Sequence, residues 1–154
     1  MRVFLGGWSG TGKTTVGNYL RSHGWVHVDV EDMFHTSPRS FGTFIRNPAV
    51  WLSDRTYPTD DVVITWGYSL ENKPTVGRIL DIGFKPVWLT GALKHSLANR
   101  ARRGDKIQHR PDLERLQEVE YLKAGYTWTN IQVFHPDGTM LATKEVADMV
   151  CDAE

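Results

Sequence analysis

Short apolar runs alternate with segments of helical periodicity along the chain. Residues 3–5 form the first apolar run, and the segment 13–23 follows with Val16 and Leu20 four positions apart on one helix face. Short apolar strands separated by helices are typical of crossover connections, which bury a parallel sheet on both faces. The pattern therefore predicts an α/β fold with three layers, α/β/α, around a five-stranded parallel sheet. The predicted strands are 3–5, 25–28, 62–65, 86–90 and 131–134, and the predicted helices are 13–23, 73–82, 93–103, 112–122 and 143–151.

Two stretches interrupt this alternation. Residues 36–58 are long and contain Pro38, Pro48 and Pro58, and residues 102–110 are basic and polar. In α/β enzymes such excursions usually cover the substrate. Neither stretch has the composition of an interdomain linker, so we expect one domain over residues 1–154.

Composition and charge narrow the class of protein. The length of 154 residues suits one domain. The 18 basic residues balance the 18 acidic ones, which excludes a global basic field but leaves room for a local basic patch. No apolar run reaches the length of a membrane span, and the single cysteine, Cys151, excludes an internal disulfide. We expect a soluble, cytoplasmic protein without a membrane partner, either a monomer or a homodimer.

The segment after the first strand carries the clearest chemistry. Residues 7–14, Gly-Trp-Ser-Gly-Thr-Gly-Lys-Thr, match the pattern G-x-x-x-x-G-K-[ST] between a predicted strand and a predicted helix. Glycines let successive amide groups point at phosphate oxygens, and the helix N-terminus adds its positive dipole end. Lys13 is expected to reach the β- and γ-phosphates, and the Thr14 hydroxyl to bind Mg²⁺. The phosphate-binding residues that we assign are Gly7, Gly10, Thr11, Gly12, Lys13, Thr14 and Thr15.

The acids after the second strand indicate which class of nucleotide-binding protein this is. Asp29, Glu31 and Asp32 follow that strand, at the edge of a parallel sheet where ligands bind. A carboxylate there can accept a proton from an attacking hydroxyl or hold Mg²⁺ through water, or it can merely complement a helix dipole. The third strand has no acid at its carboxyl end, and no guanine-reading N-K-x-D sequence occurs. Both absences favour a small phosphotransferase over a GTPase or motor ATPase.

The sequence resembles the shikimate kinase and gluconate kinase group of small P-loop kinases over most of its length. Beside the phosphate loop, Val28-Asp29-Val30-Glu31 is similar to the group's apolar-Asp-x-Asp, and Asp137-Gly138 precedes a helix as in many members. The resemblance implies a P-loop kinase fold that uses ATP and Mg²⁺. It implies that Asp29 helps Thr14 to hold Mg²⁺, and that Glu31 or Asp32 prepares the acceptor hydroxyl.

The basic stretch is similar to the group's lid, which we place at about residues 102–111. In the group, one lid arginine stacks on adenine and another, before proline, closes onto the phosphates. Arg100 and Arg103 share a helix face and are the candidates for the base, whereas Arg110 precedes Pro111 and is the candidate that neutralises phosphate charge together with Lys13. Each arginine alone is equally consistent with a solvated basic helix end.

The acceptor is where the sequence departs from the group. The third strand ends in Trp66-Gly67-Tyr68 instead of a glycine-rich tip, and residues 121–126 lack the acceptor-binding arginine. Six tryptophans are present. Trp8 and Trp66 are candidate walls of an acceptor pocket, and the others are most simply packing residues. His35 and His109 lie near the expected site.

Three functions remain open from the sequence. The leading one is transfer of the ATP γ-phosphate to a hydroxyl of a small metabolite. The first alternative is a kinase for a nucleotide, a polynucleotide 5′ end or a modified base, with nucleic acid as the partner. The second is a nucleotide-binding NTPase or regulator that has no acceptor.

Overall fold

The computed structural model describes residues 1–107 and 110–153 and contains a five-stranded sheet in the order β2-β3-β1-β4-β5. Every neighbouring pair of strands is parallel. The fold class predicted from the apolar pattern is therefore confirmed. The strands are β1 Arg2–Gly7, β2 Val26–Asp29, β3 Val62–Thr65, β4 Lys85–Thr90 and β5 Thr129–Gln132.

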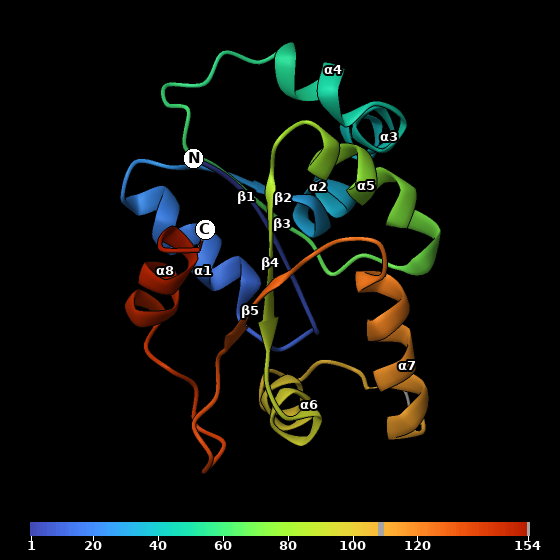
Figure 1. Cartoon of the computed structure of the whole chain (residues 1–154), viewed down its shortest axis with the longest axis vertical. Coiled ribbons are helices and arrows are strands. Elements are labelled where there is room, and N and C mark those ends of the chain that lie inside the picture. The colour runs from blue at the N-terminus through green and yellow to red at the C-terminus, as the bar shows by residue number, and fades with distance from the viewer. Residues whose placement is uncertain (108–109, 154) are drawn as a thin grey trace.

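Helices cover both faces of the sheet (Figure 1). The first face is covered by α1 Lys13–Ser22 and α8 Thr143–Cys151. The second is covered by α2 Val30–Thr36, α3 Pro38–Arg46, α4 Pro48–Ser53, α5 Lys73–Asp81, which follows the short 3₁₀ turn Leu70–Asn72, and α7 Asp112–Lys123. The remaining helix, α6 Leu93–Arg102, lies beyond the arrowhead of β4 (Figure 1).

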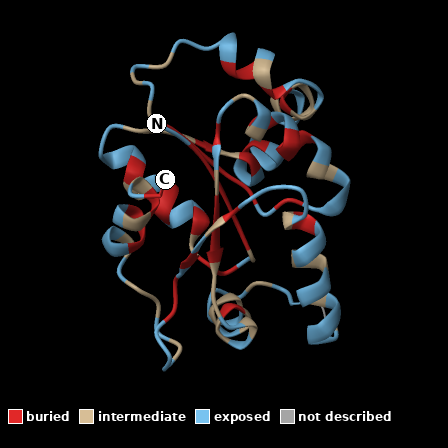
Figure 2. Ribbon diagram, in the orientation of Figure 1, coloured by how far each residue is buried: buried red, intermediate tan, exposed pale blue. Residues whose placement is uncertain are grey.

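The alternation of side chains along the strands divides the core in two. Val3 and Leu5 of β1 pack toward α1 and α8, whereas Phe4 packs toward the opposite helices. All three side chains are fully buried, as the red strands of Figure 2 show for the sheet as a whole. The central strand is thus apolar on both faces, as a parallel sheet between two helix layers requires.

The order of the strands fixes where a ligand can bind. The chain leaves β1 toward α1 on the first face, and it leaves the neighbouring strand β3 toward α5 on the second face. In open α/β sheets, ligands bind in the crevice at the carboxyl ends of two such neighbouring strands. The loop after β1 and the tip of β3 border that crevice here.

The proline-rich stretch 36–58 contributes to the core. Pro38 and Pro48 occupy the first positions of α3 and α4, where a proline costs no hydrogen bond. Phe44 of α3 is fully buried, and its ring lies 5.3 Å from that of Trp51 of α4. The stretch is therefore largely two short helices that complete one face of the fold.

Two expectations need correction. The last strand runs from Thr129 to Gln132 instead of 131–134, because Thr129 pairs with Val87 and the apolar run leaves the ladder after Gln132. Its end, Phe134, forms an isolated antiparallel bridge with Met140. Trp66 is 5% exposed and packs between Phe44 and Tyr68, so it belongs to the core.

Truncating Phe44 tests the role of the 36–58 stretch. We expect Phe44→Ala to lower the free energy of unfolding by about 3–5 kcal/mol, because it empties a fully buried site beside two tryptophans. The matched control is Phe34→Ala, which should cost about 1 kcal/mol or less because Phe34 is 53% exposed. Urea unfolding followed by circular dichroism measures both. Equal losses in the two variants would contradict the packing described.

Candidate functional site

The loop between β1 and α1 is shaped to surround an anion. Gly7, Gly10 and Gly12 all have positive φ, which turns the backbone back on itself. The α1 N-terminus has no side-chain cap, so the amide groups of its first turn lack a protein acceptor from that source. An uncapped helix N-terminus behind a glycine-rich turn is the arrangement that binds phosphate.

Lys13 is buried within this loop. It is 7% exposed, and its Nζ donates to the carbonyl oxygens of Gly7 and Trp8, each at 3.0 Å. Burial lowers the pKa of Lys13 from 10.5 to about 8, although the Glu31 carboxylate nearby favours the charged form. A phosphate group in the loop would favour the charged form further.

Helix α6 supports the loop from outside. The Ser96 hydroxyl donates to the Ser9 carbonyl at 2.5 Å, and the Asn99 amide donates to the Gly10 carbonyl at 2.8 Å. A Cβ at Gly10 would stand 2.6 Å from the Ser96 carbonyl oxygen, so only glycine allows this approach. Ser96 and Asn99 are not among the predicted site residues, since serine and asparagine on a helix carry no distinctive signal.

Thr14 and Asp29 form the part of the site suited to a cation. The Thr14 hydroxyl donates to Asp29 Oδ2 at 2.8 Å, which leaves the hydroxyl lone pairs available. The other Asp29 oxygen caps α2 by accepting from the Asp32 amide at 3.0 Å, so the carboxylate is fixed. No cluster of three or more His, Cys, Asp or Glu side chains occurs among the described residues. The oxygen ligands of Thr14 and Asp29 fit Mg²⁺ that is shared with phosphate and water.

Glu31 reaches the tip of β3 beside Lys13. Its Oε1 accepts from the Gly67 amide at 3.2 Å. A Cβ at Gly67 would stand 2.7 Å from that oxygen and 3.4 Å from Lys13 Nζ, so glycine is what allows the three groups to meet. The end of β2 and the tip of β3 therefore bring a carboxylate to the phosphate loop.

Asp32 lies apart from this meeting point. Its side chain borders a different depression, with Thr36 and Ser40, on the side of α2 that faces α3. Of the two acids proposed to prepare an acceptor, Glu31 is the one that borders the cavity next to the phosphate loop.

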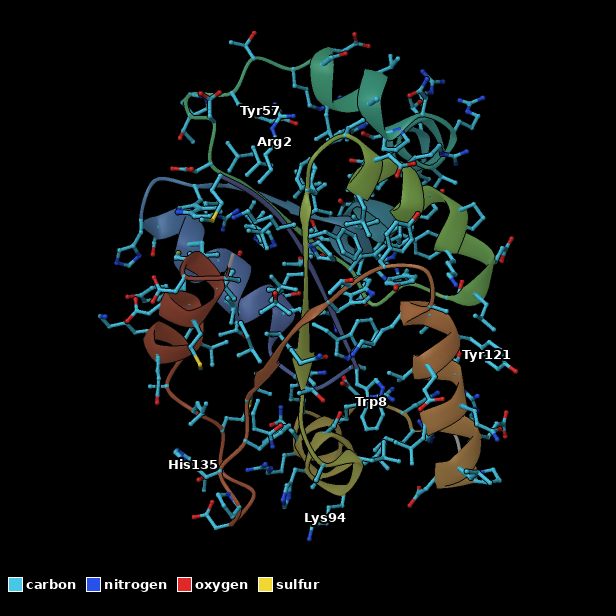
Figure 3. The ribbon with its side chains drawn as sticks, viewed as in Figure 1. Arg2, Trp8, Tyr57, Lys94, Tyr121 and His135 are labelled. Atoms are coloured by element: carbon cyan, nitrogen blue, oxygen red, sulfur yellow. The ribbon has the colours of Figure 1, made fainter. Side chains whose placement is uncertain are left out.

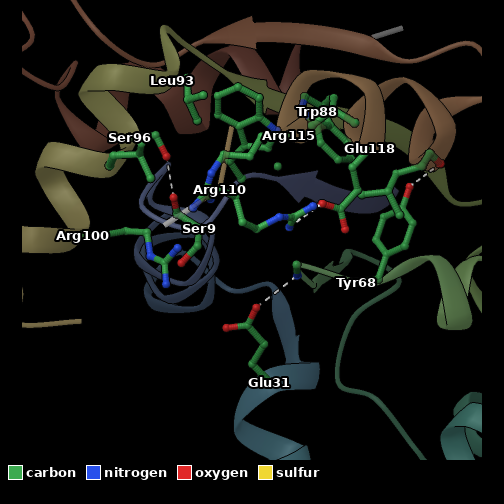
Figure 4. Close-up of a pocket in the computed structure, with 16 residues that line it drawn as sticks. Ser9, Glu31, Tyr68, Trp88, Leu93, Ser96, Arg100, Arg110, Arg115 and Glu118 are labelled. Atoms are coloured by element: carbon green, nitrogen blue, oxygen red, sulfur yellow. Dashed lines mark hydrogen bonds and ion pairs between the residues drawn. The ribbon is translucent and has the colours of Figure 1, made fainter. Parts of the chain in front are cut away.

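That cavity has a volume of about 160 Å³ and lies between the phosphate loop, the tips of β3 and β4, α6 and α7 (Figure 4). Trp8 projects toward it from the loop, between α6 and α7 (Figure 3). The other aromatic walls are Tyr68 and Trp88. Trp8 thus borders the cavity, as expected. The second tryptophan in the wall is Trp88, whereas Trp66 was expected.

The arginines of the basic stretch lie around the cavity and the phosphate loop. Arg100 borders the cavity, and its Nη2 donates to the Lys106 carbonyl at 3.1 Å. Arg103 is paired with Asp105 at 2.5 Å and is half-exposed outside the cavity. The lid predicted at 102–111 includes positions 108 and 109, so the predicted place of His109 near the site lies outside the described residues.

Arg110 also borders the cavity, but it is held by two carboxylates of α7. Its guanidinium lies 3.0 Å from Glu114 and 2.8 Å from Glu118, and this pairing raises the pKa of Arg110. To reach a phosphate it would have to exchange these partners. Glu118 was not anticipated, although its spacing of four residues from Glu114 on a predicted helix was a usable signal.

Helix α7 meets the core only at its C-terminal end. Leu122 is 7% exposed and lies under the cavity, whereas Leu113 and Leu116 of the same apolar stripe are 66% and 49% exposed. The N-terminal half of α7 therefore stands away from the sheet, directly after the basic stretch.

Comparison with known proteins identifies the fold. No known family model matches the chain, and no curated protein sequence matches it. Solved structures do match. A tunicamycin resistance protein from Deinococcus radiodurans superposes with a TM-score of 0.66 at 17% identity, over 97% of this chain and 92% of that one. Shikimate kinase from Aquifex aeolicus gives 0.59 at 18% identity, over 99% and 95% of the two chains.

A sugar kinase from Janibacter sp. HTCC2649 is a further match, with a TM-score of 0.52 at 16% identity over 99% of this chain and 92% of that one. Within the described residues, no helix is both long and apolar enough to cross a membrane. The chain thus has the fold of the small P-loop kinases, the group that its phosphate loop and strand-end acids resemble.

Proposed function

We propose that this protein is a kinase that transfers the γ-phosphate of ATP to a hydroxyl group of a small molecule. The observation that supports this most strongly is the placement of Glu31, beside the phosphate-loop lysine and at the border of a cavity. A hydrolase can also use a carboxylate to position water, but a protein that only bound or hydrolysed a nucleotide would not need an acceptor cavity beside that carboxylate. The likeness to small-molecule kinases agrees with the proposal.

The proposed reaction is a direct transfer. The acceptor oxygen forms a bond to the γ-phosphorus, the bond from that phosphorus to the β–γ bridging oxygen breaks, and ADP leaves. Glu31 accepts the proton of the acceptor hydroxyl. Lys13 and the amide groups of the loop bind the phosphates and neutralise the charge that is transferred.

Thr14 and Asp29 would hold Mg²⁺, which when bound supplies further neutralisation of phosphate charge. Arg100 is proposed to face the nucleotide, because its side chain lies against the phosphate loop at Gly10. Arg103 is proposed to assist at the base, and Arg110 to turn from Glu118 to the phosphates when a nucleotide is bound. The amide and hydroxyl groups of Thr11 and Thr15 are proposed to complete the phosphate site.

Replacing Lys13 tests the phosphate site. We expect Lys13→Ala to lower kcat for phosphate transfer by about a thousandfold or more, because the variant lacks the buried ammonium group that neutralises the transferred phosphoryl group. The matched control is Lys94→Ala, since Lys94 is on α6 and points into solvent (Figure 3). Thermal unfolding should show that both variants are folded. Transfer by Lys13→Ala at the wild-type rate would contradict the assignment.

A pair of isosteric variants separates the two acids. Glu31→Gln should lower kcat by about 10²–10⁴-fold, because it removes the proposed proton acceptor while keeping the bond from Gly67. Asp32→Asn should change kcat by less than about threefold, because Asp32 borders a different depression. Steady-state rates at saturating ATP measure both. The reverse order of effects would assign the role to Asp32.

The lowered pKa of Lys13 predicts proton uptake on binding ATP. At pH 8 about half of the free protein carries a neutral amine, because the pKa is about 8. Phosphate oxygens favour the ammonium form, so binding raises that pKa and takes up a fraction of a proton at pH 8 but almost none at pH 6. Calorimetric titration in buffers of different ionisation enthalpy measures the uptake.

The control for this titration is Lys13→Arg, whose side chain stays charged throughout this range. It should bind without the lysine-dependent uptake at pH 8. Equal uptake by the wild type and the arginine variant would show that another group is responsible.

A further inference from the structure

The wall of the cavity beside Glu31 has an apolar and aromatic part. Trp8 comes from the phosphate loop, Tyr68 from the segment after β3, and Trp88 from β4. Apolar side chains of α6 and α7 close the sides, namely Leu93, Leu97, Val119 and Leu122. Figure 4 shows Leu93, Trp88 and Tyr68 around the hollow, with Glu31 below it.

The aromatic floor is rigid. The rings of Tyr68 and Trp88 meet edge to face at 6.2 Å, and Trp88 meets Trp128 in the same way at 5.3 Å. Tyr68 and Trp88 are 5% and 3% exposed, and burial raises the pKa of Tyr68 far above its ordinary value. A packed cluster of this kind offers an apolar surface of fixed shape.

Several polar groups in the wall are already engaged. The Tyr68 hydroxyl donates to the Leu122 carbonyl at 2.8 Å, and the Ser96 hydroxyl donates to the Ser9 carbonyl at 2.5 Å. Arg110 is paired with Glu118 at 2.8 Å. A polyhydroxylated acceptor needs a partner for each hydroxyl that it buries, because an unpaired buried hydroxyl is costly. Along the aromatic and aliphatic part of the wall, such partners are few.

The size of the resting cavity suits an acceptor group of one ring. Its volume is about 160 Å³. An apolar cavity of ~150 Å³ in another protein accommodates benzene. A single ring with a short side arm would fill this space.

We propose that the acceptor is an aromatic alcohol with a single ring, whose apolar ring lies on Tyr68 and Trp88 and whose hydroxyl points at Glu31. This inference rests on the proposed kinase function and specifies its substrate class. The hydroxyl lies at the Glu31 end because Glu31 and Lys13 both approach Gly67 there. Apart from Glu31, the charged groups among the described wall residues are Arg100, Arg110, Arg115 and Glu118, an excess of arginines that suits the phosphate being transferred.

The test is transfer of labelled γ-phosphate from ATP to three sets of acceptors. These are one-ring aromatic alcohols and phenols, polyhydroxylated acids and sugars, and oligonucleotides with a free 5′ hydroxyl. We expect kcat/KM for the best aromatic alcohol to exceed that of the other sets at least tenfold. Preferred transfer to a sugar acid or an oligonucleotide would overturn the substrate class and leave the kinase function standing.

Absence of labelled product with every set would overturn the substrate class as well. Incubation with a metabolite extract and labelled ATP then tests the kinase function. A labelled product that forms with the wild type and not with Lys13→Ala would support that function. If the protein hydrolyses ATP and no compound in the extract raises the rate or receives the phosphate, the kinase function is contradicted too. The two failures are therefore distinguishable.

A pair of variants on α7 ties the preference to this wall. Val119→Asn places an amide in the apolar side of the cavity and should raise KM for the aromatic alcohol at least tenfold, with the affinity for ATP unchanged. Its matched control, Leu116→Asn, is on the exposed face of the same helix and should leave both constants unchanged. Leu97→Asn on α6 provides a second wall variant should Val119→Asn unfold. An unchanged KM in a folded wall variant would contradict the proposal.

Discussion

The buried ammonium group of Lys13 is the constraint on which the site depends. A cation inside a protein needs compensating oxygen atoms, and here the carbonyl oxygens of Gly7 and Trp8 supply them. The loop can place those oxygens only because glycines give it positive φ at three positions. Burial lowers the pKa of Lys13 to about 8, because nearby negative charge does not fully balance the ammonium group in the free protein. A polyphosphate supplies the missing negative charge.

The topology of the sheet brings the other groups to this cation. Because β1 lies between β3 and β4, the loop after β1 is bordered by the tips of both neighbours. Glu31, two residues beyond β2, reaches Gly67 at the tip of β3. Helix α6 fixes the loop from the far side through Ser96 and Asn99. Groups from distant parts of the chain thus converge because parallel strands end at one edge.

Much of this could be predicted from the sequence, for physical reasons that differ by element. The alternation of apolar strands and helices predicts the layers because each strand must be apolar on both faces, as Val3, Phe4 and Leu5 illustrate. The phosphate loop is predictable because its chemistry requires particular residues at fixed spacing. The register of β5 is not, since the pairing of Thr129 with Val87 depends on the neighbouring strand more than on local apolarity.

The walls of the acceptor cavity were the least predictable part. Trp66 and Trp88 both lie at strands that reach the site, and composition alone does not tell which one borders it. The stretch 36–58 has the length and prolines of a segment that covers substrate, and its Phe44 and Trp51 side chains pack against each other in the core. Arg110 precedes a proline as expected, but Glu114 and Glu118 hold it in the resting arrangement. Such choices depend on tertiary contacts between segments far apart in sequence.

The account stands on one claim, that the phosphate loop and Glu31 act together on a phosphoryl group and an acceptor. Phosphorus NMR of the protein with ATP, Mg²⁺ and the acceptor that the labelled-transfer test selects is the direct test, because a phosphate ester and inorganic phosphate give separate signals. The account predicts that ADP and the ester form together in equal amounts, and that Glu31→Gln suppresses both. ADP accompanied only by inorganic phosphate, at a rate that neither the acceptor nor Glu31→Gln changes, would contradict it.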